Sequence, residues 1–267
     1  MSLKGLKIVL TGKFSGQSRS DAKAALKKAG ASVGSSVTAK TDLLIAGAKA
    51  GSKIYDARDK GVPILADAHL QMLLNGDEVD EVVALARTFY SIGKTSEDPG
   101  DGSCMFSGGV PQVGADRWPM WGDEPMRHML TLDLAAMPAL EVYYPGHRAL
   151  SLFMVRNDEL DMYALSNPNN GCFELLASTE DELATAGDPP MGAADAAWGK
   201  RWITLETHGW DDLDGAFGGE RVLGGVPCWC QSQQHQGRFL MQLGEGWGPS
   251  GDGLLYVFDD SVFAQFT

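Results

Sequence analysis

The chain has 267 residues, which is long enough for one large or two medium domains with a substantial core. Hydrophobic residues make up 44% and charged residues 21%, as in an ordinary globular protein. No run of about 18 apolar residues is present, and the first residues lack the apolar core of a secretory signal. We therefore expect a cytoplasmic protein without a membrane partner.

Charge divides the sequence sharply. Residues 1–76 contain 12 lysines and arginines against 5 aspartates and glutamates, a net charge of +7. The remaining residues contain 10 basic and 30 acidic side chains, a net charge of −20. This break predicts two units with different electrostatic partners. The basic unit is suited to phosphates, whereas the acidic unit should repel nucleic acid.

The first 76 residues alternate between predicted strands and helices. Short apolar and β-branched segments predict strands at residues 6–11, 31–33, 43–46 and 62–65. Helices are predicted to begin near Ser20–Asp21, Ser52 and Asp67, and each ends at a glycine. This alternation predicts a parallel sheet with right-handed crossovers. Pro63 places the last strand at an edge, or marks where it begins.

Two of these boundaries fall where a parallel sheet holds ligands. Thr11–Gly12 ends the first predicted strand, and Lys53 begins the second predicted helix. Ligands of such sheets meet the carboxyl ends of strands and the N-termini of helices. The sequence therefore predicts an anion site that includes these residues. The segment 47–53 does not have the spacing of a P-loop, so nucleotide hydrolysis is not expected.

The first unit resembles a BRCT domain. The motifs that carry the resemblance are Leu3–Gly12, Ser18–Lys23, Gly30–Val33, Ser36–Gly47 and Gly51–Lys53. They are similar to the single BRCT of bacterial NAD-dependent DNA ligases and of the replication factor C large subunit, over nearly all of residues 3–75. The resemblance implies a four-stranded parallel sheet with flanking helices. The large aromatic residue usual in the last helix is absent, and His69 and Leu70 occupy that region.

The resemblance also implies a phosphate pocket, which many members build from a Ser or Thr, a Gly and a Lys. The matching residues are Thr11, Gly12 and Lys53, and Arg19 matches a basic residue of members that bind DNA ends. DNA is favoured as the source of phosphate because further cations lie on or beside the first helix. These DNA-binding candidates are Lys13, Arg19, Lys23 and Lys27.

Simpler roles for the pocket residues stay open. Thr11 can satisfy the backbone at the strand end, Gly12 can form a turn, and Lys53 can be a solvated residue of the first helical turn. Some BRCT domains also bind protein surfaces without phosphate.

Residues 77–107 are predicted to join the two units, as a helix over 77–92 and a loop over 94–109. Residues 108–267 contain a repeated pattern. Gly108–Pro111 and Gly224–Pro227 both read Gly-Gly-Val-Pro and are both followed by tryptophan and apolar segments. We therefore predict an α+β, mainly antiparallel domain with possible internal duplication. The tryptophans Trp118, Trp121, Trp229 and Trp247 are expected to lie mainly in the core.

The second unit resembles the YwqG-like family of bacterial domains of unknown function. The clearest motifs are Leu223–Pro227, Phe239–Leu243 and Gly251–Phe258. The resemblance covers most of residues 105–267 and implies no known activity, although some relatives are suspected to act in toxin–immunity systems between bacteria.

No catalytic constellation can be assembled from the sequence. Cys228, Cys230 and His235 lack the usual spacing of zinc ligands, so no metal and no cofactor are expected. We predict a non-enzymatic, phosphate-docking adaptor linked to DNA repair or replication. Its basic unit would bind 5′-phosphorylated DNA or a phosphoprotein, and its acidic unit an unknown protein. The alternatives are an interaction or immunity-type protein whose acidic domain binds a partner, and an enzyme hidden in the second unit.

Overall fold

The computed structural model describes residues 3–14, 16–47, 50–98, 103–156, 165, 167, 171–193, 199–209, 221–224, 239–244, 253–258 and 261–266. The described chain separates into two compact units, the first ending at Thr88 and the second beginning at Phe89. None of its helices is long and apolar enough to span a membrane.

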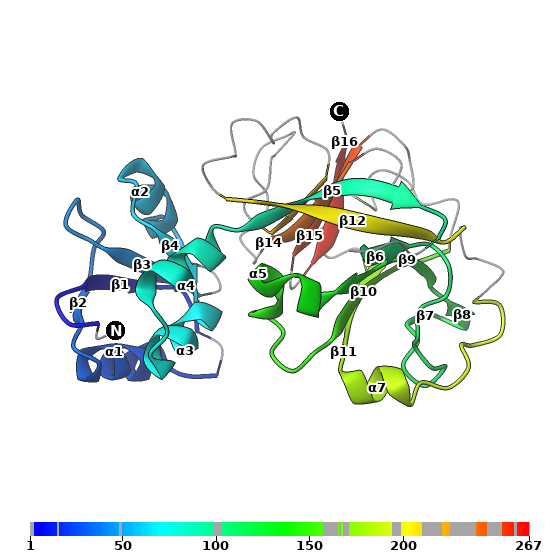
Figure 1. The fold of residues 1–267 in the computed structure, drawn as a ribbon, viewed down its shortest axis with the longest axis horizontal. Helices are drawn as coiled ribbons and strands as arrows, with labels where there is room; N and C mark the ends of the chain where they lie inside the picture. Colours follow the sequence, from blue (N-terminus) through cyan, green and yellow to red (C-terminus); the bar gives the residue numbers. More distant parts are fainter. Residues whose placement is uncertain are drawn as a thin grey trace. The chain divides into compact units, whose positions relative to one another are not determined.

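The first unit is built on a four-stranded parallel sheet with the strand order β2-β1-β3-β4 (Figure 1). Its strands are β1 (Lys7–Thr11), β2 (Ser32–Gly34), β3 (Leu43–Ala46) and β4 (Ile64–Ala66). Its helices are α1 (Arg19–Lys28), α2 (Lys53–Asp59), α3 (Asp67–Asn75) and α4 (Val79–Ala86). The predicted α/β architecture is confirmed, and β4, which follows Pro63, lies at an edge of the sheet.

Alternation along the central strand creates two cores. Ile8 and Leu10 of β1 pack with Leu26 of α1 and with residues of α3 and α4. Val9 points to the opposite face and packs with Ala57 of α2. Because successive side chains of a strand face opposite ways, one apolar strand serves both cores. Figure 1 shows the corresponding layers, with α1, α3 and α4 on one face of the sheet and α2 on the other.

The helix ends differ in detail from the sequence prediction. Ser18, rather than Ser20–Asp21, caps α1, and its hydroxyl accepts a hydrogen bond from the backbone N–H of Asp21. Ser52 makes no capping bond to α2. His69 is fully buried in α3, and its Nδ1 accepts from the backbone N–H of Ala66. The residue in place of the usual aromatic therefore helps to begin the helix.

The segment predicted to join the units needs correction. Helix α4 belongs to the first unit, because Val82 is fully buried in its core. The helix ends at Ala86, and Phe89–Ser96 forms strand β5 of the second unit. Part of the predicted loop is strand β6 (Ser103–Ser107). Both segments are extended because they pair with β12, a strand about a hundred residues later.

The second unit is dominated by a ten-stranded sheet in the order β11-β10-β9-β6-β12-β5-β13-β14-β15-β16. Every pairing between its described strands is antiparallel, which confirms the predicted character of this region. The further strands are β9 (Arg127–Asp133), β10 (Ala149–Met154), β11 (Phe173–Ser178), β12 (Arg201–His208), β13 (Arg221–Gly224), β14 (Phe239–Leu243), β15 (Gly253–Phe258) and β16 (Val262–Phe266). A separate hairpin contains β7 (Met120–Trp121) and β8 (Glu124–Pro125). The helical segments are η1 (Leu134–Ala136), α5 (Pro138–Glu141) and α7 (Glu180–Ala184).

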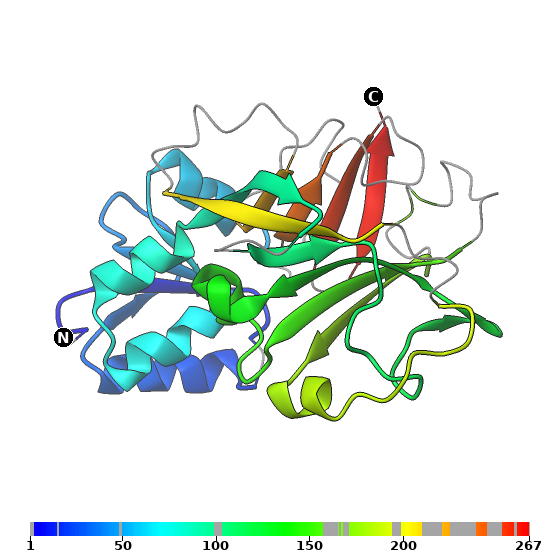
Figure 2. The same ribbon diagram turned by 45° about the vertical axis from the view of Figure 1, so that its right-hand side comes forward.

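The strand order follows the same pattern in the two halves of this sheet. β6, β9, β10 and β11 follow one another outward on one side, and β13, β14, β15 and β16 do so on the other. Between them, β12 pairs with β6, while β5 pairs with β13, as if each half had given its first strand to the other (Figure 2). A duplication with exchanged first strands would produce this order. Most of the second Gly-Gly-Val-Pro segment lies outside the described residues.

Candidate functional site

Two loops of the first unit are joined at the carboxyl end of its sheet. The backbone N–H of Gly47, after β3, donates to the carbonyl of Thr11 at 3.0 Å. The hydroxyl of Thr11 donates to the carbonyl of Ala50 at 2.5 Å. A β-carbon on Gly47 would lie 2.2 Å from the carbonyl oxygen of Lys13, so only glycine allows this approach. The segment after β1 is therefore held against Gly47 and against Ala50, which precedes α2.

The side chain of Thr11 is buried and hydrogen-bonded within the domain. Its side chain is only 4% exposed, and the hydrogen of its hydroxyl is committed to the Ala50 carbonyl. In this geometry the hydroxyl cannot also donate to a phosphate oxygen, because it carries a single hydrogen. Thr11 instead fixes the loop that leads to Lys53, which is the structural role that the sequence left open.

Gly12 and Lys53 lie at this same corner. Gly12 has a φ of +79°, a left-handed conformation that disfavours residues with a β-carbon, and it forms the turn after β1. Lys53 is half-buried at the first position of α2, three residues beyond Ala50, so at most about 11 Å of extended chain separates them. Among the described residues, no carboxylate pairs with Lys53. The helix has only seven residues, so we assign no role to its dipole.

The predicted DNA-binding cations lie on α1 and in the loop after β1. Arg19, Lys23 and Lys27 are all exposed and occupy positions i, i+4 and i+8 of α1, so they share one face of the helix. Lys13 is exposed in the loop after β1. None of these four side chains has an ion-pair partner among the described residues. Like charges at this spacing weaken a helix slightly. The stripe of cations therefore does not stabilise α1.

The first unit is thus a small three-layer α/β domain with a basic corner at the carboxyl end of its sheet. Residues 2–70 match the family described as the BRCA1 C Terminus (BRCT) domain. This part of the chain is a BRCT domain, as its motifs predicted. The match ends at residue 70, so the resemblance of the second unit to YwqG-like domains stays a prediction.

Two relatives match the same region. A DNA ligase of Alkalilimnicola ehrlichii is 53% identical over 72 residues, which are 27% of this chain and 11% of that ligase. A DNA ligase of Parasynechococcus marenigrum is 50% identical over 74 residues, which are 28% of this chain and 11% of that ligase. The chain therefore matches only about a tenth of the length of these curated relatives, in their BRCT regions.

The second unit contains a buried chain of hydrogen bonds that the sequence did not reveal. His128 joins the carbonyl of Gly108 through Nδ1 at 3.0 Å and the hydroxyl of Thr131 through Nε2 at 2.9 Å. Thr131 in turn bonds to Ser151 at 2.7 Å. Burial of the imidazole lowers the pKa of His128 to about 4. All three side chains are buried, so these hydrogen bonds are suited to holding β9 and β10 together rather than to contacting a substrate.

Two further predictions concern the second unit. Trp118 is buried as expected, but Trp121 is 49% exposed, which corrects its predicted place in the core. Among the described residues, no group of three or more His, Cys, Asp or Glu side chains could hold a metal. Cys228, Cys230, His235, Trp229 and Trp247 lie outside the described residues.

Proposed function

We propose that the chain is a non-enzymatic adaptor whose BRCT domain docks on DNA at a 5′-phosphorylated end. The observation that supports the proposal is the hydrogen bond from Thr11 to Ala50, which ties the loop of Gly12 to the segment leading to Lys53, together with the exposed cations on α1. The similarity to BRCT regions of DNA ligases supports DNA as the source of phosphate and links the chain to repair or replication. A phosphoprotein is the other source of the same chemistry.

In this proposal the residues contact different phosphates of the DNA. The ammonium group of Lys53 and the backbone at Gly12 meet the terminal phosphate, and Thr11 holds their two loops in register. Arg19, Lys23 and Lys27, with Lys13, meet backbone phosphates of the duplex and add affinity without reading sequence. The acidic second unit, with a net charge of −17 over residues 89–267, binds a protein partner rather than nucleic acid.

A second candidate function follows from that charge alone. An immunity-type or interaction protein would use the acidic unit to neutralise a basic partner, and its BRCT domain would serve only for docking. A chain of this kind would bind DNA without preference for a terminal phosphate.

The test is a fluorescence anisotropy titration of the full-length chain with one duplex carrying either a 5′-phosphate or a 5′-hydroxyl group. We expect tighter binding to the phosphorylated duplex, by roughly tenfold or more if one charge-assisted hydrogen bond is gained. Lys53→Glu should abolish this preference. The matched variant Lys60→Glu makes the same charge change at an exposed position after α2 and should retain it. A wild-type chain that binds both duplexes equally would refute the proposal.

A further inference from the structure

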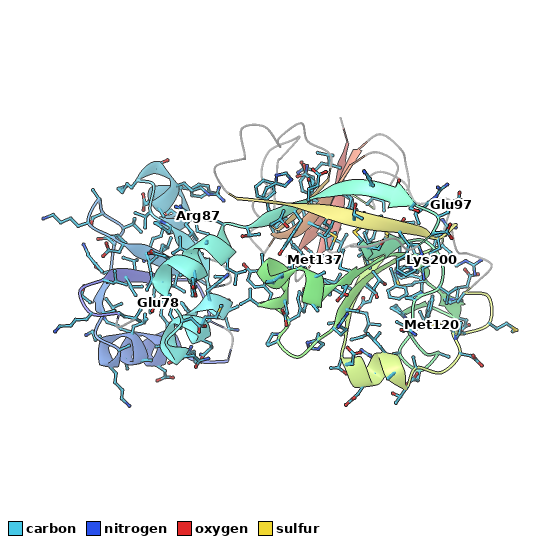
Figure 3. All side chains as sticks on the ribbon, viewed as in Figure 1. Glu78, Arg87, Glu97, Met120, Met137 and Lys200 are labelled. Carbon is cyan, nitrogen blue, oxygen red and sulfur yellow. The ribbon has the colours of Figure 1, made fainter. Side chains whose placement is uncertain are left out.

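Apolar side chains gather at the β7–β8 hairpin of the second unit. Met120 is 44% exposed and Trp121 is 49% exposed, although both belong to β7. Met191 is 97% exposed. Its neighbour Gly192 lies against Pro125, since a β-carbon on Gly192 would be 3.9 Å from Cγ of that proline, and Pro125 pairs with Met120 across the hairpin. Figure 3 labels Met120 at this hairpin.

Large apolar side chains that gather on a surface differ from single exposed ones, which are common in globular proteins. Four large hydrophobic residues are exposed in the described part of the chain, and three of them are Met120, Trp121 and Met191. Tryptophan and methionine are also enriched at protein–protein interfaces relative to the rest of a protein surface. The hairpin therefore has the composition of a contact surface.

The base of the hairpin is firmly held. The indole N–H of Trp118 donates to the carbonyl of Met126 at 2.9 Å, and the backbone N–H of Met126 donates to the carbonyl of Pro119 at 2.9 Å. Trp118 is buried edge-on against Phe153, with ring centroids 5.1 Å apart. Trp118 thus anchors the hairpin in the core, whereas Trp121, three residues later, is exposed. A binding surface that is already ordered loses less conformational entropy when a partner docks.

Four exposed carboxylates lie within a few residues of the exposed apolar side chains in the chain. Asp123 and Glu124 lie in the hairpin itself, and Asp116 and Asp188 lie in the segments beside it. All four are exposed, and none has an ion-pair partner among the described residues. Of the nearby cations, Arg117 pairs with Glu182 at 2.9 Å, and Arg156 donates to the backbone carbonyl of Gly192 at 3.2 Å. A second copy of this chain would bring like charges together across the contact, whereas a cationic partner would neutralise them.

We infer that the β7–β8 hairpin, together with Met191, is the docking surface for a basic protein partner. A recess of the partner receives Trp121, and its arginine or lysine side chains meet Asp123 and Glu124. Arginine suits this surface because its guanidinium group stacks on an indole ring and bonds to a carboxylate. The inference rests on the proposed role of the second unit in binding protein, and it is independent of what the BRCT domain binds.

The first part of the test locates the contact. The full-length chain is produced in its native cells with p-benzoylphenylalanine at position 191, or at position 174 as an exposed control on β11. We expect irradiation to attach a basic protein at position 191 and not at position 174. Attachment at 174 alone would overturn the hairpin as the surface and leave a protein-binding role intact. Attachment at neither position would overturn both, and attachment of a second copy or of an acidic protein would overturn the inference.

The second part measures affinity with the attached protein after its purification. Trp121→Ala should weaken binding by roughly 30-fold, the effect of a central aromatic anchor. Asp123→Lys combined with Glu124→Lys should also weaken binding and reduce its dependence on salt. Glu141→Lys combined with Glu174→Lys makes the same change in net charge at exposed positions elsewhere and should retain most of the affinity. Equal losses in the two charge variants, or no loss in Trp121→Ala, would overturn the inference.

Discussion

The hydroxyl group of Thr11, at the end of β1, donates a buried hydrogen bond of 2.5 Å to the carbonyl of Ala50, which lies 39 residues later and just before α2. The bond connects the loop that contains Gly12 to the loop that presents Lys53. Thr11, for which the family resemblance implies direct contact with phosphate, therefore uses its hydroxyl hydrogen to join two loops of the domain.

Replacement of Thr11 tests how much this hydrogen bond stabilises the first unit. Thr11→Val keeps the shape of the side chain but leaves the buried carbonyl of Ala50 without its donor, which should cost about 1–3 kcal/mol of folding free energy. Thr11→Ser keeps the hydroxyl and should cost about 1 kcal/mol for the lost methyl group. Hydrogen exchange of amides in β1 and β3 measures the effect within the first unit. Equal protection in both variants would show that the hydrogen bond contributes nothing.

Gly47 offers an independent probe of the joined loops. Gly47→Ala places a β-carbon 2.2 Å from the carbonyl oxygen of Lys13, so the two loops must separate. We expect this variant to lose the preference for a 5′-phosphate in the anisotropy titration. Gly51→Ala is the control, because its β-carbon meets nothing within 4 Å and only the φ of +70° is strained, at a cost of about 1–2 kcal/mol. Should Gly51→Ala lose the preference and Gly47→Ala keep it, the joined loops do not form the site.

The stripe on α1 should contribute affinity without selectivity. Lys23→Gln combined with Lys27→Gln is expected to weaken binding of phosphorylated and hydroxyl-ended duplexes by the same factor. The slope of log affinity against log salt should become shallower by about 2, because each lost phosphate contact removes about 0.9. Lys40→Gln combined with Lys60→Gln removes the same charge from exposed positions off α1. A shallower slope in both pairs of variants would indicate a general charge effect rather than a stripe.

The first unit could be predicted from sequence because its information is local. Each strand is a short apolar segment bounded by glycine or proline, and the helices between them have one apolar face, such as Ala22 and Leu26 on α1. The end of β1 at Thr11 and the beginning of α2 at Lys53 were also predicted. The direction of the Thr11 hydroxyl was not, because its partner at Ala50 is a backbone carbonyl and leaves no mark in the sequence.

The second unit was harder to predict because its contacts are distant in the chain. Phe89 continues the helical spacing of α4, yet it is buried in β5, whose partners β12 and β13 lie more than 100 residues later. Local periodicity cannot show such partners. Trp118 and Trp121 are likewise similar in sequence context. Only the fold shows that one indole bonds to Met126 while the other is exposed.

His128 makes the stability of the second unit dependent on pH. Burial lowers the pKa of this imidazole to about 4, whereas in an unfolded chain it would be about 6.5. The folded state therefore holds the neutral form, and its stabilising contribution is complete above pH 6.5. As the pH falls from 6.5 to 4, His128 binds a proton in the unfolded chain but stays largely neutral in the folded unit. This difference should cost about 3 kcal/mol of stability by pH 4.

The comparison of wild type with His128→Gln isolates this effect from other titrations. All seven tryptophans of the chain lie beyond residue 108, so intrinsic fluorescence during urea unfolding reports on the second unit alone. We expect the variant to be less stable at pH 7, because the bonds that link Gly108 to Thr131 are disturbed. The stability difference between the two proteins should then shrink as the pH is lowered from 7 to 4, since only the wild type loses the contribution of a neutral imidazole. A difference that stays constant over this range would mean that position 128 does not titrate on unfolding, and the buried chain from Gly108 to Ser151 would have no part in acid sensitivity.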